Sequence, residues 1–117
     1  MSKARDRLVL EIVGTDSTFE KREVRGETAW VGRCLHCNRK LVVALDGRTA
    51  ATIEHCVPQN HGGTDELDNL ALACAPCNRQ KGFRHDFKKP DDPRAREVID
   101  ALLARRRARW RTGHDGA

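Results

Sequence analysis

The sequence predicts an α+β fold with an N-terminal β segment, a small central core and a C-terminal arginine-rich helix. Short apolar, β-branched runs recur in the first half of the chain, and apolar residues recur at helical spacing after Pro93. Two C-x-x-C pairs lie between these regions. In a chain of 117 residues with 33% charged and 4% aromatic residues, a single domain usually needs a cross-link or a metal ion to stay folded.

The N-terminal part, residues 1–33, is predicted to be a β extension of the core. Residues 7–13 (RLVLEIV) are apolar and β-branched, residues 19–24 alternate weakly, and residues 28–33 lead into the first cysteine pair. We expect one strand in each stretch, with the charged second strand at a sheet edge. Nothing in this part points to a functional site.

The central part, residues 34–82, is predicted to contain a β-hairpin and a short helix. Residues 41–45 and 49–54 flank Asp46-Gly47, a dipeptide typical of tight hairpin turns. His55 would then lie at the end of the returning strand, where a loop over residues 58–64 begins. Residues 74–81 are expected to start a helix that Gly82 ends.

The C-terminal part, residues 83–117, is predicted to be a connector followed by a basic helix. Asp91-Asp92-Pro93 is a typical helix start. Seven arginines and two acidic residues between positions 93 and 111 account for the whole net charge of +5. Arginine matches phosphate geometry, so a polyanionic partner and a merely solvated helix face both explain this charge. The apolar stripe of this helix consists of Ala95, Val98, Ile99, Leu102 and Leu103.

The two C-x-x-C pairs, Cys34 with Cys37 and Cys74 with Cys77, predict a structural metal site. The N-terminus is not a convincing signal peptide, so we expect a cytoplasmic protein whose thiols stay reduced. Four thiolates are the ligand set of a closed, structural Zn²⁺ site. Unrelated buried thiols and a dithiol redox site are the alternatives. The fifth cysteine, Cys56, is interpreted as a small buried hydrophobic residue.

The run TIEHCVPQNHGGTDELDNLALACAPCNRQKG, residues 52–82, resembles the HNH endonuclease family, in particular the subgroup with a four-cysteine zinc site. The similarity extends from Cys34 to Gly82, under half of the chain. It implies a ββα-metal fold that is stabilised by a structural zinc ion. This fold presents one further divalent cation to a scissile phosphate. The implied activity is hydrolysis of phosphodiester bonds in DNA, by nicking or by cleavage of both strands.

The resemblance also implies roles for individual residues. His55 matches the general base that takes a proton from the attacking water, and Glu54, where Asp is commoner, matches the acidic metal ligand. Asn69 matches the asparagine that holds the loop and orients the histidine. Asn78 matches the last motif position, which supplies a second metal ligand. Oxygen ligands of this kind suit Mg²⁺ or Mn²⁺ as the catalytic ion.

The expected partner is DNA, and no membrane partner is expected. A homodimer or a larger nucleic-acid-processing complex is also compatible with the sequence. The alternative function is a zinc-stapled nucleic-acid-binding module without significant catalysis, for example a subunit of a phage packaging or restriction complex. We favour the enzyme because a binding module does not need Glu54, His55, Asn69 and Asn78 together. Contacts with nucleic acid are expected from Arg79, Lys81, Arg105, Arg106, Arg107 and Arg109, and solvation of the helix surface is the competing explanation.

Overall fold

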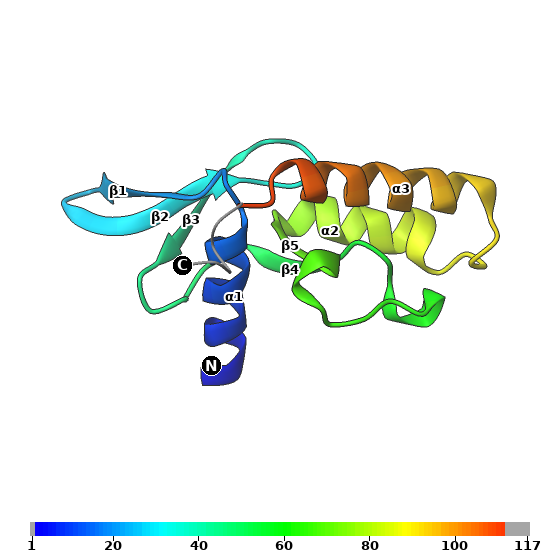
Figure 1. The fold of residues 1–117 in the computed structure, drawn as a ribbon, viewed down its shortest axis with the longest axis horizontal. Coiled ribbons are helices and arrows are strands. Elements are labelled where there is room, and N and C mark those ends of the chain that lie inside the picture. The colour runs from blue at the N-terminus through cyan, green and yellow to red at the C-terminus, as the bar shows by residue number, and fades with distance from the viewer. Residues whose placement is uncertain (1, 112–117) are drawn as a thin grey trace.

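The computed structural model describes residues 2–111, in which two small antiparallel sheets are packed among three α-helices (Figure 1). The first sheet has the order β1-β2-β3, and the second pairs β4 with β5. This mixture of helices and strands confirms the predicted α+β class. The strands are β1 (Glu20–Val24), β2 (Glu27–Arg33), β3 (Lys40–Ala44), β4 (Thr52–His55) and β5 (Leu70–Ala73). The α-helices are α1 (Lys3–Thr15), α2 (Ala75–Lys81) and α3 (Pro93–Ala108).

The first sheet matches the strands expected at residues 19–24, 28–33 and 41–45 to within one or two residues. Strand β1 is charged, mostly exposed and at the sheet edge, as predicted. Arg25 and Gly26 join it to β2, both with positive φ, as a two-residue hairpin turn requires. Figure 1 shows the β1–β2 hairpin of this sheet extending away from α2 and α3.

The strand predicted over residues 7–13 is wrong, because these residues lie within helix α1. The Ser2 side chain caps the helix by accepting a hydrogen bond from the backbone N–H of Arg5 at 3.2 Å. Val9, Ile12 and Val13 are buried and recur at helical spacing, so they form one apolar face that packs into the main core. The helix therefore buries the β-branched residues that suggested a strand.

The hairpin predicted between residues 41–45 and 49–54 is also wrong in its pairing. The Asp46-Gly47 turn exists, with the Gly47 N–H donating to the Ala44 carbonyl at 2.8 Å. However, β3 pairs with β2, and β4 pairs with β5. All residues of β5 are buried, so its backbone needs a partner strand, which β4 provides.

Helix α3 begins where the sequence predicted, because the Asp92 side chain accepts a hydrogen bond from the N–H of Ala95 at 3.0 Å. Its buried Ile99 and Leu102 lie on the expected stripe. Helix α2 ends at Lys81 with Gly82 as its C-cap residue, as predicted, but Gly82 keeps a helical φ of −56° and ψ of −48°. The chain continues as a π-helix, η3 (Gly82–Asp86). None of the described helices is both long and apolar enough to cross a membrane.

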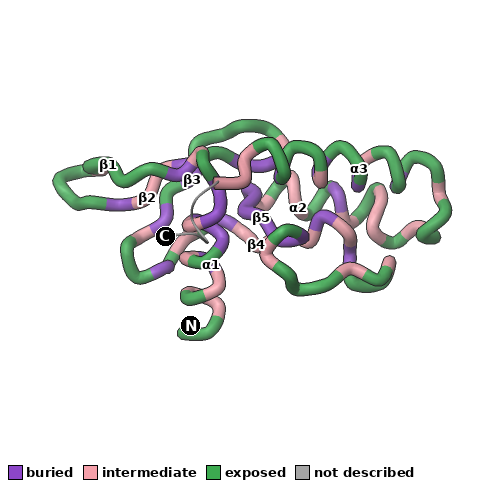
Figure 2. Tube along the Cα trace, in the orientation of Figure 1, coloured by how far each residue is buried: buried purple, intermediate pink, exposed green. Residues whose placement is uncertain are grey.

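Arg106 of α3 is fully buried and connects three parts of the fold. Its guanidinium donates to the carbonyls of Leu70 (2.6 Å), Leu67 (3.1 Å) and Thr15 (3.1 Å) and to the Thr15 hydroxyl. It also stacks on the Trp110 ring at 4.9 Å. Burial lowers the pKa of this guanidinium, but its hydrogen bonds to carbonyl oxygens compensate part of the lost hydration. Figure 2 shows the buried positions concentrated where α1, β5 and α3 meet.

We expect Arg106→Met to lower the free energy of unfolding by at least about 2 kcal/mol, because several buried carbonyls would lose their donor. The matched control is Arg107→Met, which removes the same charge from an exposed position and should change stability by less than about 0.5 kcal/mol. Urea unfolding followed by circular dichroism measures both. Equal stability of the two variants would contradict a structural role for Arg106.

Candidate metal and catalytic sites

The four cysteines of the two C-x-x-C pairs come together as the sequence predicted. The sulfur atoms of Cys34, Cys37, Cys74 and Cys77 all lie within 4.8 Å of one another. The Cys37 and Cys74 sulfurs are 3.9 Å apart. Four ligands about 2.3 Å from a Zn²⁺ ion in a tetrahedron would lie about 3.8 Å apart. The cluster can therefore hold a metal ion and is consistent with zinc.

The surroundings of the cluster also favour a metal ion. The N–H of Cys74 donates to the Cys34 sulfur at 3.3 Å, the kind of hydrogen bond that stabilises a thiolate. A hydrogen bond from the backbone of Arg39 is the main cause that lowers the pKa of Cys37 to about 7. Burial raises the pKa of Cys77 in the absence of a cation. A bound cation would reverse that effect, because metal coordination deprotonates thiols.

Strands β4 and β5 and helix α2 form a ββα unit directly beside the cysteine cluster (Figure 1). Helix α2 covers the free edge of β4, the edge that faces away from β5. There the Asn78 side-chain N–H₂ donates to the Ile53 carbonyl at 3.2 Å, and the Lys81 ammonium donates to the His55 carbonyl at 3.0 Å. Two side chains of α2 thus replace the missing neighbouring strand.

Glu54 is buried, with a relative exposure of 1%, and has two cationic or polar partners. One carboxylate oxygen is in direct contact with His36 Nε2, and the other lies 3.2 Å from the Lys81 ammonium. Lys81 also bonds to the Asp86 carboxylate at 2.7 Å. Because each buried charge has an opposite partner, the group can persist in the interior. His36 was not predicted from the sequence, because no motif position indicated it.

His55 lies on the opposite face of β4 from Glu54, since successive side chains of a strand alternate. Its imidazole is partly exposed, with 27% side-chain exposure, and Nε2 lies 2.8 Å from the Asp65 carboxylate. Asp65 comes from the loop between β4 and β5. A carboxylate in this position fixes the orientation and tautomer of an imidazole. Asp65 was not predicted, because only the folded loop brings it to His55.

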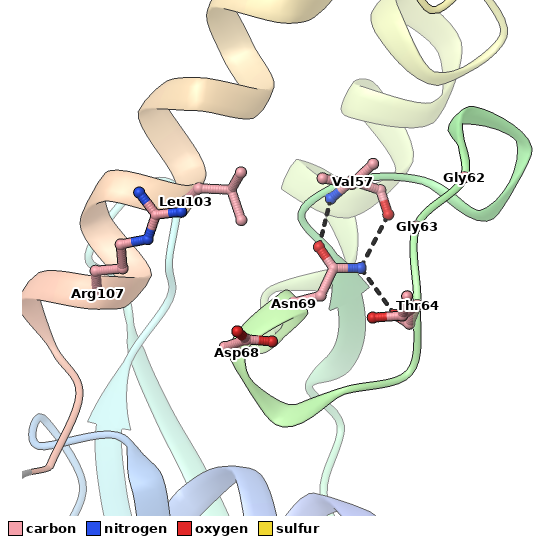
Figure 3. Close-up of a pocket in the computed structure, with 8 residues that line it drawn as sticks. All are labelled: Val57, Gly62, Gly63, Thr64, Asp68, Asn69, Leu103 and Arg107. Carbon is pink, nitrogen blue, oxygen red and sulfur yellow. Dashed lines mark hydrogen bonds between the residues drawn. The ribbon is translucent and has the colours of Figure 1, made fainter.

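Asn69 is buried and holds the loop that follows β4 (Figure 3). Its side chain accepts from the Val57 N–H at 2.8 Å and donates to the carbonyls of Val57 and Thr64. The Gly-Gly pair completes the loop. Gly62 has a φ of +85°, and a Cβ on Gly63 would lie 1.8 Å from the Val57 carbonyl oxygen.

The residues predicted to contact nucleic acid fall into three groups. Arg79, Arg105 and Arg107 are exposed. Lys81 and Arg106 are buried and bonded within the protein, so the prediction that they contact nucleic acid does not fit their positions. Arg109 donates to the Arg33 carbonyl at 2.9 Å and to Asn38 Oδ1 at 2.6 Å, so it ties α3 to the first cysteine turn.

A surface pocket of about 320 Å³ lies between the cysteine cluster and η3. Most of its lining side chains are polar or cationic, and they include both residues that contact Glu54. A second pocket, of about 180 Å³, lies between the β4–β5 loop and α3 (Figure 3). His55 lines neither pocket. The first pocket is lined by His36, Cys37, Cys77, Gln80, Lys81, Arg84, His85 and Val98.

The candidate ligands for a catalytic cation are chemically suitable. The Thr52 hydroxyl donates to the Ala73 carbonyl and therefore accepts from Asn78, whose amide N–H₂ is also bonded to Ile53. This orientation leaves Asn78 Oδ1 as the amide atom that can bind a cation. Glu54 supplies carboxylate oxygens, the other donor type that Mg²⁺ and Mn²⁺ prefer.

We predict that removing metal from the cysteine cluster unfolds the protein, because the small core depends on this link. Cys56 can report the transition. It is fully buried, and burial, helped by the negative charge of Glu54, raises its pKa to about 11. We expect iodoacetamide at pH 8 to alkylate Cys56 only after chelation, as measured by peptide mass spectrometry.

The control for this experiment is addition of Zn²⁺ before the alkylating reagent, which should restore protection of Cys56. A metal-free protein that keeps Cys56 protected and still unfolds cooperatively would contradict the prediction.

Comparison with known proteins gives one match, over the part of the chain that contains both sites. Residues 34–84 match the family model of the HNH endonucleases. Comparisons with curated proteins and with solved structures give no match. The matched segment begins at the first cysteine and contains Glu54, His55, Asn69, Asn78 and the complete cysteine cluster. Residues 34–84 of this protein therefore resemble a domain of the HNH endonuclease family.

Proposed function

We propose that this protein is a metal-dependent endonuclease that hydrolyses phosphodiester bonds in DNA. The observation that carries the proposal is the ββα unit in which His55 and Glu54 end β4 while Asn78 lies on the helix docked against that strand. Asn78 follows Cys77 directly, so the cysteine cluster fixes the start of the helix that carries it. Each residue of the proposed machinery is thus held by the domain's most rigid elements.

His55 is the proposed general base. A neutral imidazole can accept a proton from water near physiological pH, and partial exposure of His55 lets water and substrate approach it. Asp65 would hold the ring in position through its contact with Nε2. The resulting hydroxide attacks phosphorus, the bond to the 3′ oxygen breaks, and that oxygen takes a proton from solvent water, which leaves a 5′-phosphate and a 3′-hydroxyl.

Glu54 and Asn78 are the proposed ligands of one divalent cation, either Mg²⁺ or Mn²⁺. Such an ion, when bound, stabilises negative charge on the scissile phosphate and on the departing oxygen. Glu54 is paired with His36 and Lys81. A cation can therefore bind Glu54 only if it shares the carboxylate with these two residues or displaces them. Zn²⁺ is the proposed occupant of the cysteine cluster, with a structural role only.

The exposed arginines, Arg79, Arg105 and Arg107, are the proposed contacts with the phosphate backbone. Helix α3 also supplies the buried Ile99, Leu102 and Arg106. Deletion of this helix would therefore unfold the domain, and its role in binding is better tested by substituting exposed arginines one at a time.

The alternative is a nucleic-acid-binding module without significant catalysis, and the pairing of Glu54 inside the protein favours it. Both oxygens of this carboxylate already have partners, which is a stable arrangement without any cation. Salt-sensitive binding of DNA with no cleavage in Mg²⁺ or Mn²⁺ would support this alternative over the enzyme.

We expect His55→Ala to reduce nicking of supercoiled plasmid by at least about 100-fold in Mg²⁺ or Mn²⁺, since general-base catalysis typically contributes that much. Gel electrophoresis of the nicked and linear products measures the rate. Unfolding curves of the zinc-loaded variant would show whether the fold is intact. Nicking by His55→Ala at the rate of the unchanged protein would exclude His55 from the mechanism.

Asp65 and its neighbour Glu66 provide a matched pair, because both are exposed acids in the same loop. We expect Asp65→Ala to slow nicking by about tenfold through loss of the imidazole's partner, and Glu66→Ala to leave the rate unchanged. The same assay compares them. Equal effects of the two substitutions would show that the rate depends on the negative charge of the loop and not on the orientation of His55.

A further inference from the structure

Phe83 and Phe87 are the most exposed large apolar side chains in the described part of the chain, at 72% and 69%. They are four residues apart, in and directly after η3, and therefore lie on a similar face of the helical segment. The chain has three phenylalanines and no tyrosine, and the third phenylalanine, Phe19, is fully buried. Two of the few aromatic side chains are thus placed on the surface, where they do not stabilise the core.

The segment that carries these phenylalanines is anchored at its backbone. The Asn60 side chain donates to the Asp86 carbonyl at 2.6 Å, and the His61 ring bonds to the Lys88 carbonyl at 2.6 Å. The Asp86 carboxylate is held by Lys81 at 2.7 Å. The two aromatic rings therefore project from a fixed support, which lowers the entropy that a partner must overcome on binding.

The charges around the two rings are positive. Arg84 and Lys89 are exposed and Lys88 is partly exposed, whereas the only acid within the segment, Asp86, is bonded to the Lys81 ammonium. Aromatic side chains among cations are the pattern of surfaces on which bases stack while phosphates pair with the cations. A protein-binding surface would instead be depleted in lysine.

We propose that Phe83 and Phe87 form a base-stacking site for an unpaired stretch of nucleic acid. Bases within a duplex are stacked on one another, so only a single strand, a loop or an opened junction offers base faces to these rings. The proposal rests on the proposed function and specifies its substrate as nucleic acid with unpaired bases beside the cleavage point.

The stacking site adjoins the proposed catalytic site. Arg84 and His85, from the same helical segment, line the pocket of about 320 Å³ together with His36 and Lys81, the two partners of Glu54. A strand whose bases stack on the phenylalanines would extend its phosphates toward this pocket. Stacking of the bases would then select the position of cleavage, without base-specific hydrogen bonds.

The test measures binding of fluorescein-labelled oligonucleotides by anisotropy, with the zinc-loaded full chain and no added Mg²⁺ or Mn²⁺. One probe is a single-stranded 12-mer, and the other is a duplex of the same sequence. The variant is Phe83→Ala with Phe87→Ala. The matched control is Val42→Ala with Leu45→Ala, which removes the other two exposed large apolar side chains, in and directly after β3.

We expect the phenylalanine variant to bind the single strand at least about thirtyfold more weakly, the effect of losing two stacked bases. Its affinity for the duplex and the salt dependence of binding should change little, because no charge is removed. The control variant should bind both probes like the unchanged protein. A Phe83→Trp, Phe87→Trp variant should retain single-strand affinity, because stacking needs only an aromatic ring.

Unchanged single-strand affinity of the alanine variant would overturn the proposal, and so would an equal loss for the control variant. An alanine variant that keeps its affinity but loses self-association in sedimentation would assign the rings to a protein contact instead. Failure of the proposed function is a separate result: the unchanged protein would then nick no DNA in Mg²⁺ or Mn²⁺, whatever its binding of single strands.

Discussion

The ammonium of Lys81 links the elements that surround the proposed catalytic residues. It is buried and contacts the Glu54 carboxylate, the Asp86 carboxylate and the carbonyl of His55. These contacts link the end of β4, helix α2 and the segment that carries the exposed phenylalanines. A buried ammonium is stable only with such partners, so the three elements are held in one relative position.

Arg106 and, with a metal ion bound, the cysteine cluster would add links that a small core lacks. The cluster connects the turn before β3 with the start of α2, across a gap that contains the whole β4–β5 pair. On the other side, Arg106 satisfies carbonyls from α1 and from the chain around β5. In both cases polar or ionic groups take the place of aromatic packing, which fits a chain with 4% aromatic residues.

The two proposed catalytic roles lie on different faces of β4. Glu54 points inward, toward His36 and Lys81, where a cation would find oxygen donors in a shielded environment. His55 points to the other face and is partly exposed beside Asp65. Alternation along a strand separates the acid from the base although they are neighbours in sequence. The proposed metal ligand and the proposed base therefore have different surroundings at adjacent positions of one strand.

The sequence by itself determined the features that depend on local chemistry or on fixed spacing. The cysteine pairs, the Gly-Gly loop around Asn69, the Asp92 cap of α3 and its apolar stripe all follow from residue types within a few positions of one another. The tertiary structure decided which strand pairs with β4, whether residues 7–13 form a helix, and where the long cationic side chains lie. Lys81 and Arg106 looked like surface charges because a sequence shows that a cation is present but not which distant carbonyls and carboxylates surround it. His36 and Asp65 escaped prediction for the same reason, since their roles depend on contacts that only the folded chain creates.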